Sequence, residues 1–170
     1  MTAPRLTFLL GGARSGKSAY AEKLISALPS PWIYVATAQA FDEEMKARIR
    51  LHQARRDERW QTIETPHEIV RVLQDSPAGR PLLLDSLTVW LGNRLLHEAN
   101  LTRECRQLLE VLARPTGPWF IVSDETGMGI VPDNALARRF RDEAGALHQK
   151  LAALADEVIW MTAGLPLQVK

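Results

Sequence analysis

The 170-residue sequence is short of three features that would assign it to a broad class at once. It has one cysteine, Cys105, which excludes an intramolecular disulfide and a cysteine-rich zinc site and is typical of a reducing compartment. It has no excess of one charge, since 21 Lys and Arg oppose 20 Asp and Glu. We therefore expect no general attraction to nucleic acid or to a membrane surface. Its apolar runs are all far shorter than the roughly 20 residues of a membrane-spanning helix.

The first apolar run, residues 6–10, has a superficial likeness to the core of a signal peptide. It is interrupted at once by Gly11, Gly12 and Arg14, and no cleavage-site pattern follows. We therefore expect a mature, cytoplasmic protein. The hydrophobic fraction of 46% and the charged fraction of 24% are typical of globular domains. The length fits one domain, residues 1–170, which we expect to be a single nucleotide-binding catalytic domain.

Short apolar runs alternate with stretches of helical periodicity along the chain. The apolar runs predict strands at Leu6–Leu10, Trp32–Ala36, Leu82–Leu84, Trp119–Val122 and Val158–Met161, and a short edge strand at Leu167–Val169. The periodic stretches predict helices at Lys17–Leu28, Glu43–Arg56, Ser86–His97, Thr102–Ala113 and Ala135–Ala155. An apolar stripe is expected in the last helix, at Leu136, Phe140, Leu147, Leu151 and Leu154. This alternation predicts an α/β fold with a mainly parallel central sheet.

A glycine-rich segment between the first strand and the first helix matches the phosphate-loop pattern G-x-x-x-x-G-K-[ST]. Its residues are Gly11, Gly12, Ala13, Arg14, Ser15, Gly16, Lys17 and Ser18. The glycines let backbone N–H groups approach phosphate oxygens closely. Lys17 is expected to reach the β- and γ-phosphates, and the Ser18 hydroxyl to ligate Mg²⁺. Because a strand precedes the motif and a helix follows it, we predict a nucleoside triphosphate site.

Acidic residues follow two of the later strands. Asp85 ends the run 82–84, where proteins with a phosphate loop carry a carboxylate that faces Mg²⁺. Asp85 and Ser86 are also suited to cap the helix that follows, although we favour the metal role. Asp124 and Glu125 follow the next strand. They would support the metal, activate a substrate hydroxyl or cap a turn, and the sequence leaves these three roles open.

Five basic residues and no acid lie between positions 46 and 56. Arg48, His52 and Arg56 are four residues apart and share one face of the expected helix. Because neighbouring positive charge disfavours the imidazolium, His52 would keep a ring nitrogen free to attack phosphorus. Three interpretations remain open: a solvated basic face, a patch for nucleic acid or other anions, and a histidine nucleophile. The other histidines, His67, His97 and His148, are expected to be structural or solvated.

Taken together, these segments resemble the bifunctional adenosylcobinamide kinases / adenosylcobinamide-phosphate guanylyltransferases of cobalamin biosynthesis. The resemblance covers essentially the whole chain. Its main pieces are GGARSGKS at 11–18, YVATA at 34–38, DEEM at 42–45 leading to His52, LDSLT at 84–88 and GMGIVP at 127–132. The phosphate loop alone is generic, whereas the histidine helix combined with GMGIVP is much more specific.

The resemblance implies a three-layer P-loop NTPase fold of the RecA-like type and two successive reactions. ATP or GTP phosphorylates the aminopropanol hydroxyl of adenosylcobinamide, and GMP from GTP is then transferred to that phosphate through a guanylylated histidine. His52 matches this histidine, and Lys17 is the second catalytic residue implied. Ser18 and Asp85 would contact Mg²⁺. The nucleotide contacts implied outside the phosphate loop are Ala36, Thr37, Ala38, Gln53, Ala54, Arg55, Arg56, Glu64 and Asp85.

Further expectations accompany this resemblance. The carboxylate of Glu64 would accept from the two adjacent N–H groups of guanine, a donor pair that adenine lacks. The chain departs from the family pattern V-S-N-E-V-G at Asp124, where an acid replaces a neutral amide. A homotrimer with sites completed between subunits is implied. Adenosylcobinamide, its phosphate, ATP and GTP are the implied partners, with no nucleic acid and no membrane span. A simple small-molecule kinase and a nucleotide-switched binding module are the alternatives.

Overall fold

The computed structural model describes residues 6–54, 56–97 and 99–170, in which strands and helices alternate. In chain order the elements are β1 (Leu6–Gly11), α1 (Lys17–Ser26), β2 (Trp32–Ala36), α2 (Glu43–Ala54), β3 (Trp60–Glu64), α3 (Ile69–Gln74), β4 (Leu82–Asp85), α4 (Leu87–Leu96), α5 (Leu101–Leu112), β5 (Trp119–Asp124), α6 (Ala135–Leu154), β6 (Glu157–Thr162) and β7 (Leu165–Gln168). The strands form one sheet in the order β3-β2-β4-β5-β1-β6-β7. Every neighbouring pair is parallel except β6 with β7.

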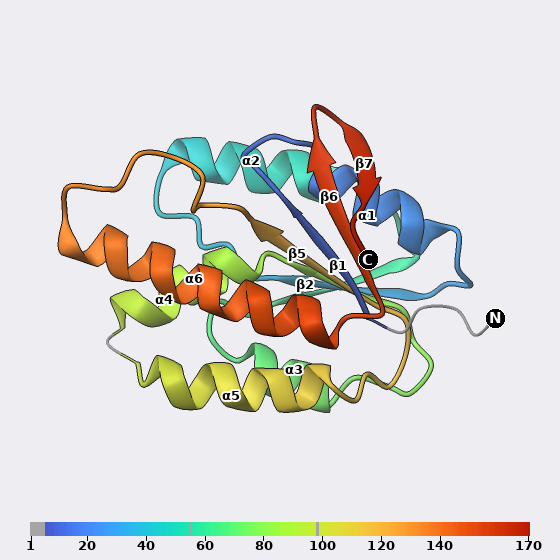
Figure 1. Cartoon of the computed structure of the whole chain (residues 1–170). Coiled ribbons are helices and arrows are strands. Elements are labelled where there is room, and N and C mark those ends of the chain that lie inside the picture. The colour runs from blue at the N-terminus through green and yellow to red at the C-terminus, as the bar shows by residue number, and fades with distance from the viewer. Residues whose placement is uncertain (1–5, 55, 98) are drawn as a thin grey trace.

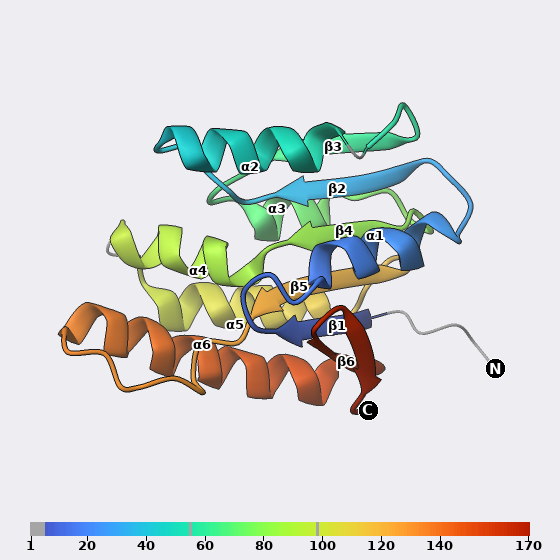
Figure 2. The same cartoon turned by 90° about the horizontal axis from the view of Figure 1, so that it is seen from above.

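Helices cover both faces of the sheet and give a three-layer arrangement. Helices α1 and α2 lie on one face, and α3 to α6 lie on the other (Figure 1). Figure 2 shows α2 at the β3 side of the sheet and α6 at the side of β1 and β6. One core cluster, including Phe8, Leu84 and Trp90, fills the layer under α3 to α6. A second cluster, including Ile25 and Trp32, packs α1 onto the opposite face. Burial of both sheet faces explains the continuous apolar runs.

The five main strands predicted from the sequence are present, and their ends agree to within two residues. The short C-terminal strand is β7, which lies at residues 165–168 rather than 167–169. Strand β3 and helix α3 were not predicted from the sequence. Strand β3 is at the edge of the sheet and its side chains are exposed or half-buried, and α3 has only six residues, so neither has a strong hydrophobic pattern. Among the described residues, no helix has both the length and the hydropathy of a transmembrane segment.

The predicted apolar stripe of α6 is correct only in its middle. Leu147 and Leu151 are buried, and Phe140 packs against the core. Leu136 and Leu154 near the two ends of the helix are 50% and 40% exposed, so this part of the prediction is wrong. A helix of 20 residues is longer than the stretch that the core covers, so an apolar pattern alone overestimates the buried face.

His148 completes the buried face of α6. Its Nε2 atom lies 2.7 Å from the hydroxyl oxygen of Ser123, a fully buried residue of β5. Its ring centroid is 5.6 Å from that of Phe8 on β1. Burial lowers the pKa of His148, and the carboxylates of Glu125 and Asp124 oppose this effect. A neutral imidazole is therefore part of the packing between α6 and the sheet.

Acidification is expected to destabilise the protein through His148. Because its folded-state pKa is below the unfolded value of 6.5, the unfolded chain takes up this proton first. The stability due to this group is complete above that value and is lost as the pH falls, by at most about 1.4 kcal/mol per pH unit. Urea unfolding followed by tryptophan fluorescence should show a steeper loss for the natural protein than for His148→Gln. Parallel pH profiles of the two proteins would contradict the assignment.

Candidate active site

The segments predicted to bind nucleotide meet at one edge of the sheet. Since β1 to β5 run parallel, their carboxyl ends and the segments that follow them lie on the same side. The phosphate loop follows β1, residues 36–38 lie at the end of β2, and Glu64 ends β3. Asp85 and Asp124 end β4 and β5. The fold thus brings these distant segments to one edge, while their functional roles stay predictions.

The phosphate loop, residues 11–18, turns sharply between β1 and α1. Gly16 precedes α1 with a φ of +95°, a left-handed conformation that glycine adopts without strain. A side chain at position 11 would collide with the carbonyl oxygen of Met161 on β6. No side chain caps the N-terminus of α1, so its first N–H groups are open to an anion.

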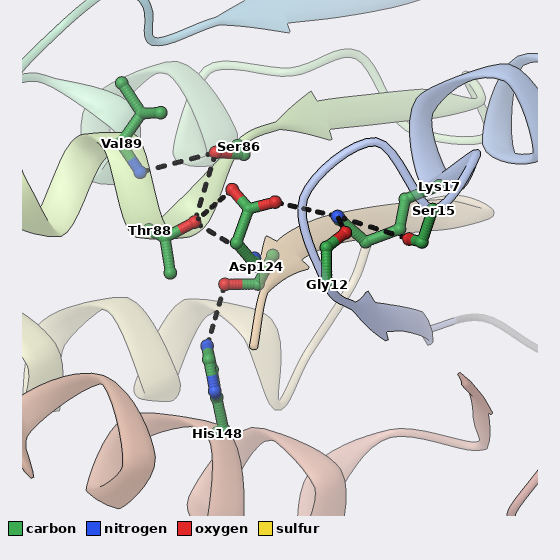
Figure 3. A network of polar contacts seen from close by, with 9 residues as sticks. Gly12, Ser15, Lys17, Ser86, Thr88, Val89, Asp124 and His148 are labelled. Atoms are coloured by element: carbon green, nitrogen blue, oxygen red, sulfur yellow. Dashed lines mark hydrogen bonds and ion pairs between the residues drawn. The ribbon is translucent and has the colours of Figure 1, made fainter. Parts of the chain in front are cut away.

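Lys17 is the first residue of α1, and its side chain is only 6% exposed. Its Nζ donates to the carbonyl oxygen of Gly12 at 2.7 Å and lies 2.7 Å from Oδ1 of Asp124 (Figure 3). The Ser15 hydroxyl is a further acceptor at 3.5 Å. A buried ammonium group needs such partners, because an unpaired buried charge is strongly unfavourable. The loop therefore combines a positive charge with an open helix N-terminus, a combination suited to phosphate.

The Asp124 carboxylate is fixed by the start of α4. Its Oδ2 accepts from the Thr88 hydroxyl at 3.0 Å, and the Asp124 N–H donates to that same hydroxyl oxygen at 3.0 Å. Ser86 lies beside this pair, with its hydroxyl oxygen 3.3 Å from that of Thr88 (Figure 3). Ser86 also accepts from the N–H of Val89, so of the two residues suited to cap α4 it is Ser86 that does so. The acid opposite Lys17 is thus held from a second element.

Asp85 takes part in a different set of contacts. Its Oδ2 accepts from the Tyr34 hydroxyl at 2.8 Å. Burial, together with the Asp85 carboxylate, raises the pKa of Tyr34 far above its ordinary value, so the phenol stays protonated and donates. The guanidinium carbon of Arg56 lies 3.7 Å from the Tyr34 ring centroid, in cation–π contact. Tyr34 therefore connects the segment after α2 to the acid at the end of β4.

Thr37 is fully buried, and its hydroxyl supports the backbone of the site. The hydroxyl donates to the carbonyl oxygen of Ser86 at 2.8 Å, and it accepts from the Ser86 N–H at 2.8 Å. The carbonyl oxygen of Thr37 accepts from the Asn93 side chain at 2.9 Å. Ala36 and Ala38 on either side are half-buried. The hydroxyl, the carbonyl oxygen and the N–H of Thr37 are thus all bonded within the protein, and contact of Thr37 with a nucleotide stays a prediction.

The described residues contain no cluster of three or more His, Cys, Asp or Glu side chains able to hold a metal ion. The predicted magnesium ligands are the Ser18 hydroxyl on α1 and the Asp85 carboxylate. Both are oxygen donors, and Mg²⁺ is commonly held by one or two protein groups together with substrate phosphates and water. The donor set therefore fits an ion that arrives with a nucleotide rather than one held by the protein alone.

Helix α2 lies on the surface, and none of its described side chains is buried. Near its end, the Gln53 side chain donates to Oε1 of Glu64 at 3.3 Å. Lys46 pairs with Glu43 at 2.6 Å in solvent, which agrees with the solvated interpretation for this part of the basic run. The backbone of His52 lies in α2, but the side chains of Arg48 and His52, and all of Arg55, lie outside the described part of the structure.

The predicted nucleotide contacts spread along the sheet edge, with residues 36–38 and Asp85 at the ends of β2 and β4 between two outer regions. One is the phosphate loop with Asp124, beside β1 and β5. The other contains Gln53 and Glu64 at β3, four strand positions from β1. At a spacing of about 4.8 Å, four positions correspond to roughly 19 Å along the sheet. Contact between the two regions requires a ligand that spans them, a movement of α2, or a second subunit.

Two residues that shape the site, Tyr34 and Thr88, were given no role from the sequence, although both lie in segments that carry the family resemblance, 34–38 and 84–88. Tyr34 carries the one hydroxyl group of a buried strand, and its burial is the signal that this hydroxyl needs a partner. The partnership of Thr88 gave no local signal, because Asp124 is 36 residues away in the sequence. The other histidines agree with the expected structural or solvated roles: the ring centroids of His67 and the exposed His97 are 4.6 Å apart, and His148 is in the core.

Comparison with solved structures identifies the fold. A protein of Pyrococcus horikoshii, known from a structural study, superposes with a TM-score of 0.56 at 11% identity, covering 98% of this chain and 86% of its own. An ATPase of the type III secretion system of pathogenic bacteria superposes with a TM-score of 0.58 at 13% identity, covering 96% and 56%. At this identity the likeness shows the fold alone, which is the predicted P-loop NTPase fold of the RecA-like type.

Comparison of sequences identifies the family. Residues 7–169 match the family model described as cobinamide kinase / cobinamide phosphate guanyltransferase. The bifunctional adenosylcobalamin biosynthesis protein CobP of Pseudomonas aeruginosa is 47% identical over 165 residues, covering 95% of each chain. The corresponding protein CobU of Salmonella typhimurium is 36% identical over 181 residues, covering 97% of this chain and 99% of its own. The chain therefore belongs to the cobinamide kinase / cobinamide phosphate guanyltransferase family, whose two activities act in the biosynthesis of adenosylcobalamin.

Proposed function

We propose that the phosphate loop holds the phosphate donor of the kinase reaction and that His52 carries GMP in the guanylyl transfer. The observation that carries this proposal is the buried ammonium of Lys17, held at the open N-terminus of α1 by an acid from β5. Such an arrangement supplies positive charge and backbone donors where negative charge develops on a transferred phosphoryl group. The whole chain, residues 1–170, then acts as one catalytic domain.

In the kinase reaction, the hydroxyl of adenosylcobinamide attacks the γ-phosphorus of a nucleoside triphosphate held by residues 11–18. The new P–O bond forms as the bond to the β-phosphate oxygen breaks, and the nucleoside diphosphate leaves. Lys17 exchanges Asp124 for the β- and γ-phosphate oxygens and neutralises their charge. Mg²⁺, held by Ser18 and Asp85 together with the phosphates, would supply further positive charge at the same oxygens.

In the guanylyl transfer, a ring nitrogen of His52 attacks the α-phosphorus of GTP and pyrophosphate leaves. The phosphate of adenosylcobinamide phosphate then attacks the same phosphorus and releases the histidine, which gives adenosylcobinamide-GDP. This is covalent catalysis in two steps. Arg56, four residues after His52, supports this assignment. Its Nη1 is buried and has no hydrogen-bond partner in the described part of the chain, so it is a donor available to an anionic ligand.

The separation of the two regions supports a homotrimer in which neighbouring subunits complete each other's sites. Helix α2 has no buried side chain among its described residues, and the edge strand β7 is exposed along its length, so both surfaces are available to another copy of the chain. We propose the cytoplasm as the compartment, because the unpaired Cys105 fits a reducing environment. Adenosylcobinamide, its phosphate, ATP and GTP are the proposed ligands.

A covalent guanylyl-enzyme is the expected signature of His52. Incubation with GTP labelled at the α-phosphate should transfer label to the protein through an acid-labile, base-stable P–N bond. His52→Ala should carry no label, and the matched variant His97→Ala, an exposed histidine at the end of α4, should be labelled like the natural protein. Label that persists in His52→Ala would reject the assignment, and a natural protein without label would favour the simple kinase.

The same preparations test the phosphate loop. Lys17→Ala should lower phosphorylation of adenosylcobinamide at least about 100-fold, because one charged group at the transferred phosphate is lost. Circular dichroism would verify that the variant is folded. Phosphorylation at the natural rate would show that the donor binds elsewhere.

Tyr34 is expected to set the affinity of the Asp85 site for magnesium. Tyr34→Phe removes the donor that orients the Asp85 carboxylate but keeps the ring under Arg56. Loss of such a supporting hydrogen bond typically weakens metal affinity about 10- to 100-fold. The Mg²⁺ concentration for half-maximal phosphorylation should rise accordingly, whereas Tyr20→Phe on α1 should leave it unchanged. An unchanged midpoint in Tyr34→Phe would separate Asp85 from the metal.

Glu64 is expected to select guanine. Glu64→Gln replaces one of the two carboxylate acceptors with an amide donor that faces the guanine N–H groups. The KM for GTP in the guanylyl transfer should rise about 10-fold or more, while use of ATP in the kinase reaction should change little. Equal losses with both nucleotides would remove the base-reading role.

A further inference from the structure

Two acids follow β5, and the structure gives them different tasks. Asp124 faces the phosphate loop, where its carboxylate pairs with Lys17 at 2.7 Å, and its side chain is still 37% exposed. Glu125 instead accepts from the N–H of Gly127 in its own loop. Of these two carboxylates, Asp124 is therefore the one that reaches both the phosphate-binding lysine and solvent.

The Asp124 carboxylate cannot follow Lys17 when the lysine turns to a phosphate. Its Oδ2 remains bonded to the Thr88 hydroxyl, and its backbone N–H is bonded to the same group. When phosphate oxygens replace Asp124 at the ammonium, Oδ1 loses its donor. Oδ1 then faces solvent next to a bound triphosphate, and the hydroxyl of a ligand that enters there is a donor that can take the place of the ammonium.

The loop after Asp124 presents apolar side chains to solvent. Met128, Ile130 and Val131 are 81%, 98% and 59% exposed. The loop is nevertheless anchored at both ends by α6: Arg141 donates to the carbonyl oxygen of Gly127 at 2.9 Å, and Arg138 donates to those of Pro132 at 2.9 Å and Asp133 at 2.8 Å. A fixed loop with outward apolar side chains is suited to hold a large apolar ligand.

We propose that Asp124 and the loop Met128–Val131 form the subsite of the alcohol acceptor. The corrinoid, a large ring system with extensive apolar faces, lies on the loop, and its hydroxyl donates to Oδ1 of Asp124 beside the γ-phosphate. The hydroxyl oxygen then attacks the γ-phosphorus, the bond to the β-phosphate oxygen breaks, and the hydroxyl proton passes to solvent. Asp124 thus orients the attacking oxygen, the main requirement in phosphoryl transfer.

The position of the loop in the chain supports this occupant. The acceptor must bring its hydroxyl to the phosphate near Lys17, and the loop begins four residues after the carboxylate that touches this lysine. The carboxylate of Asp85, by contrast, already accepts from Tyr34 and lies one strand further from β1. The inference rests on the proposed function, because it requires the phosphate donor in the loop of residues 11–18.

Separate assays of the two reactions test the role of Asp124. Asp124→Ala should lower phosphorylation of adenosylcobinamide about 100-fold or more. It should leave the guanylylation of preformed adenosylcobinamide phosphate within about 3-fold, because that reaction has no alcohol to orient. Asp124→Asn keeps an acceptor oxygen and should retain phosphorylation within about 10-fold of the natural rate. The control Asp133→Ala, an exposed acid at the far end of the same loop, should change neither reaction.

Equal losses of both reactions in Asp124→Ala, or no loss in either, would overturn the proposal. Thermal melting of the alanine and asparagine variants would separate a folding defect from loss of the acceptor. If Lys17→Ala keeps full phosphorylation, the proposed donor site is wrong. If Lys17→Ala loses phosphorylation while Asp124→Ala keeps it, only the acceptor subsite is wrong.

The apolar part of the subsite is tested by Ile130→Ser. The KM for adenosylcobinamide should rise at least about 5-fold through loss of buried apolar contact, with the KM for the nucleotide unchanged. Leu154→Ser, at a side chain 40% exposed at the opposite end of α6 from the loop, is the control and should not change the corrinoid KM. If the KM of Ile130→Ser for adenosylcobinamide is unchanged, the loop is not part of the acceptor site. If analytical ultracentrifugation shows that Ile130→Ser changes the oligomeric state of the protein, the loop is a subunit contact rather than the acceptor site.

Discussion

The buried ammonium group of Lys17 is the constraint on which the site depends. A charge with only 6% of its side chain exposed must have a partner in every state of the protein. Without nucleotide, that partner is Asp124, together with the carbonyl oxygen of Gly12. A triphosphate replaces one anion with another, so the lysine is never left uncompensated. The charge balance of the resting site is thereby matched to that of the occupied site.

The order of the strands determines which groups share this environment. Strand β5 lies between β1 and β4, so its terminal residue Asp124 is next to the phosphate loop, and Asp85 at the end of β4 is one strand further away. Asp85 in turn is reached by Tyr34 of β2, whose ring lies under Arg56. Contacts between neighbouring strands thus extend from the phosphate loop toward the segment after α2. The helix that carries His52 lies at the far end of this series.

The general fold was predictable because its signals are local. Buried parallel strands such as Trp32–Ala36 produce continuous apolar runs, and the phosphate loop has a fixed pattern of residue types, so both can be recognised within a short window. Strand β3 and helix α3 were missed because one is largely exposed and the other is short. The prediction that Leu136 and Leu154 belong to the buried stripe of α6 was wrong, because periodicity does not show where the core ends.

The partnerships within the site were not predictable, because they depend on strand order, which no local pattern encodes. Asp124 is a clear example. In the sequence it is only an acid at a position where the family pattern has an amide. In the structure its Oδ1 lies 2.7 Å from Nζ of the buried Lys17, and the carboxylate balances the charge of that lysine. With an amide at position 124, the lysine would have only neutral acceptors, such as the Gly12 carbonyl and the Ser15 hydroxyl. Thr88 holds the carboxylate in place through a hydrogen bond that would equally suit the amide oxygen. The substitution therefore changes the charge next to Lys17 while preserving the geometry, which explains how the fold accommodates it.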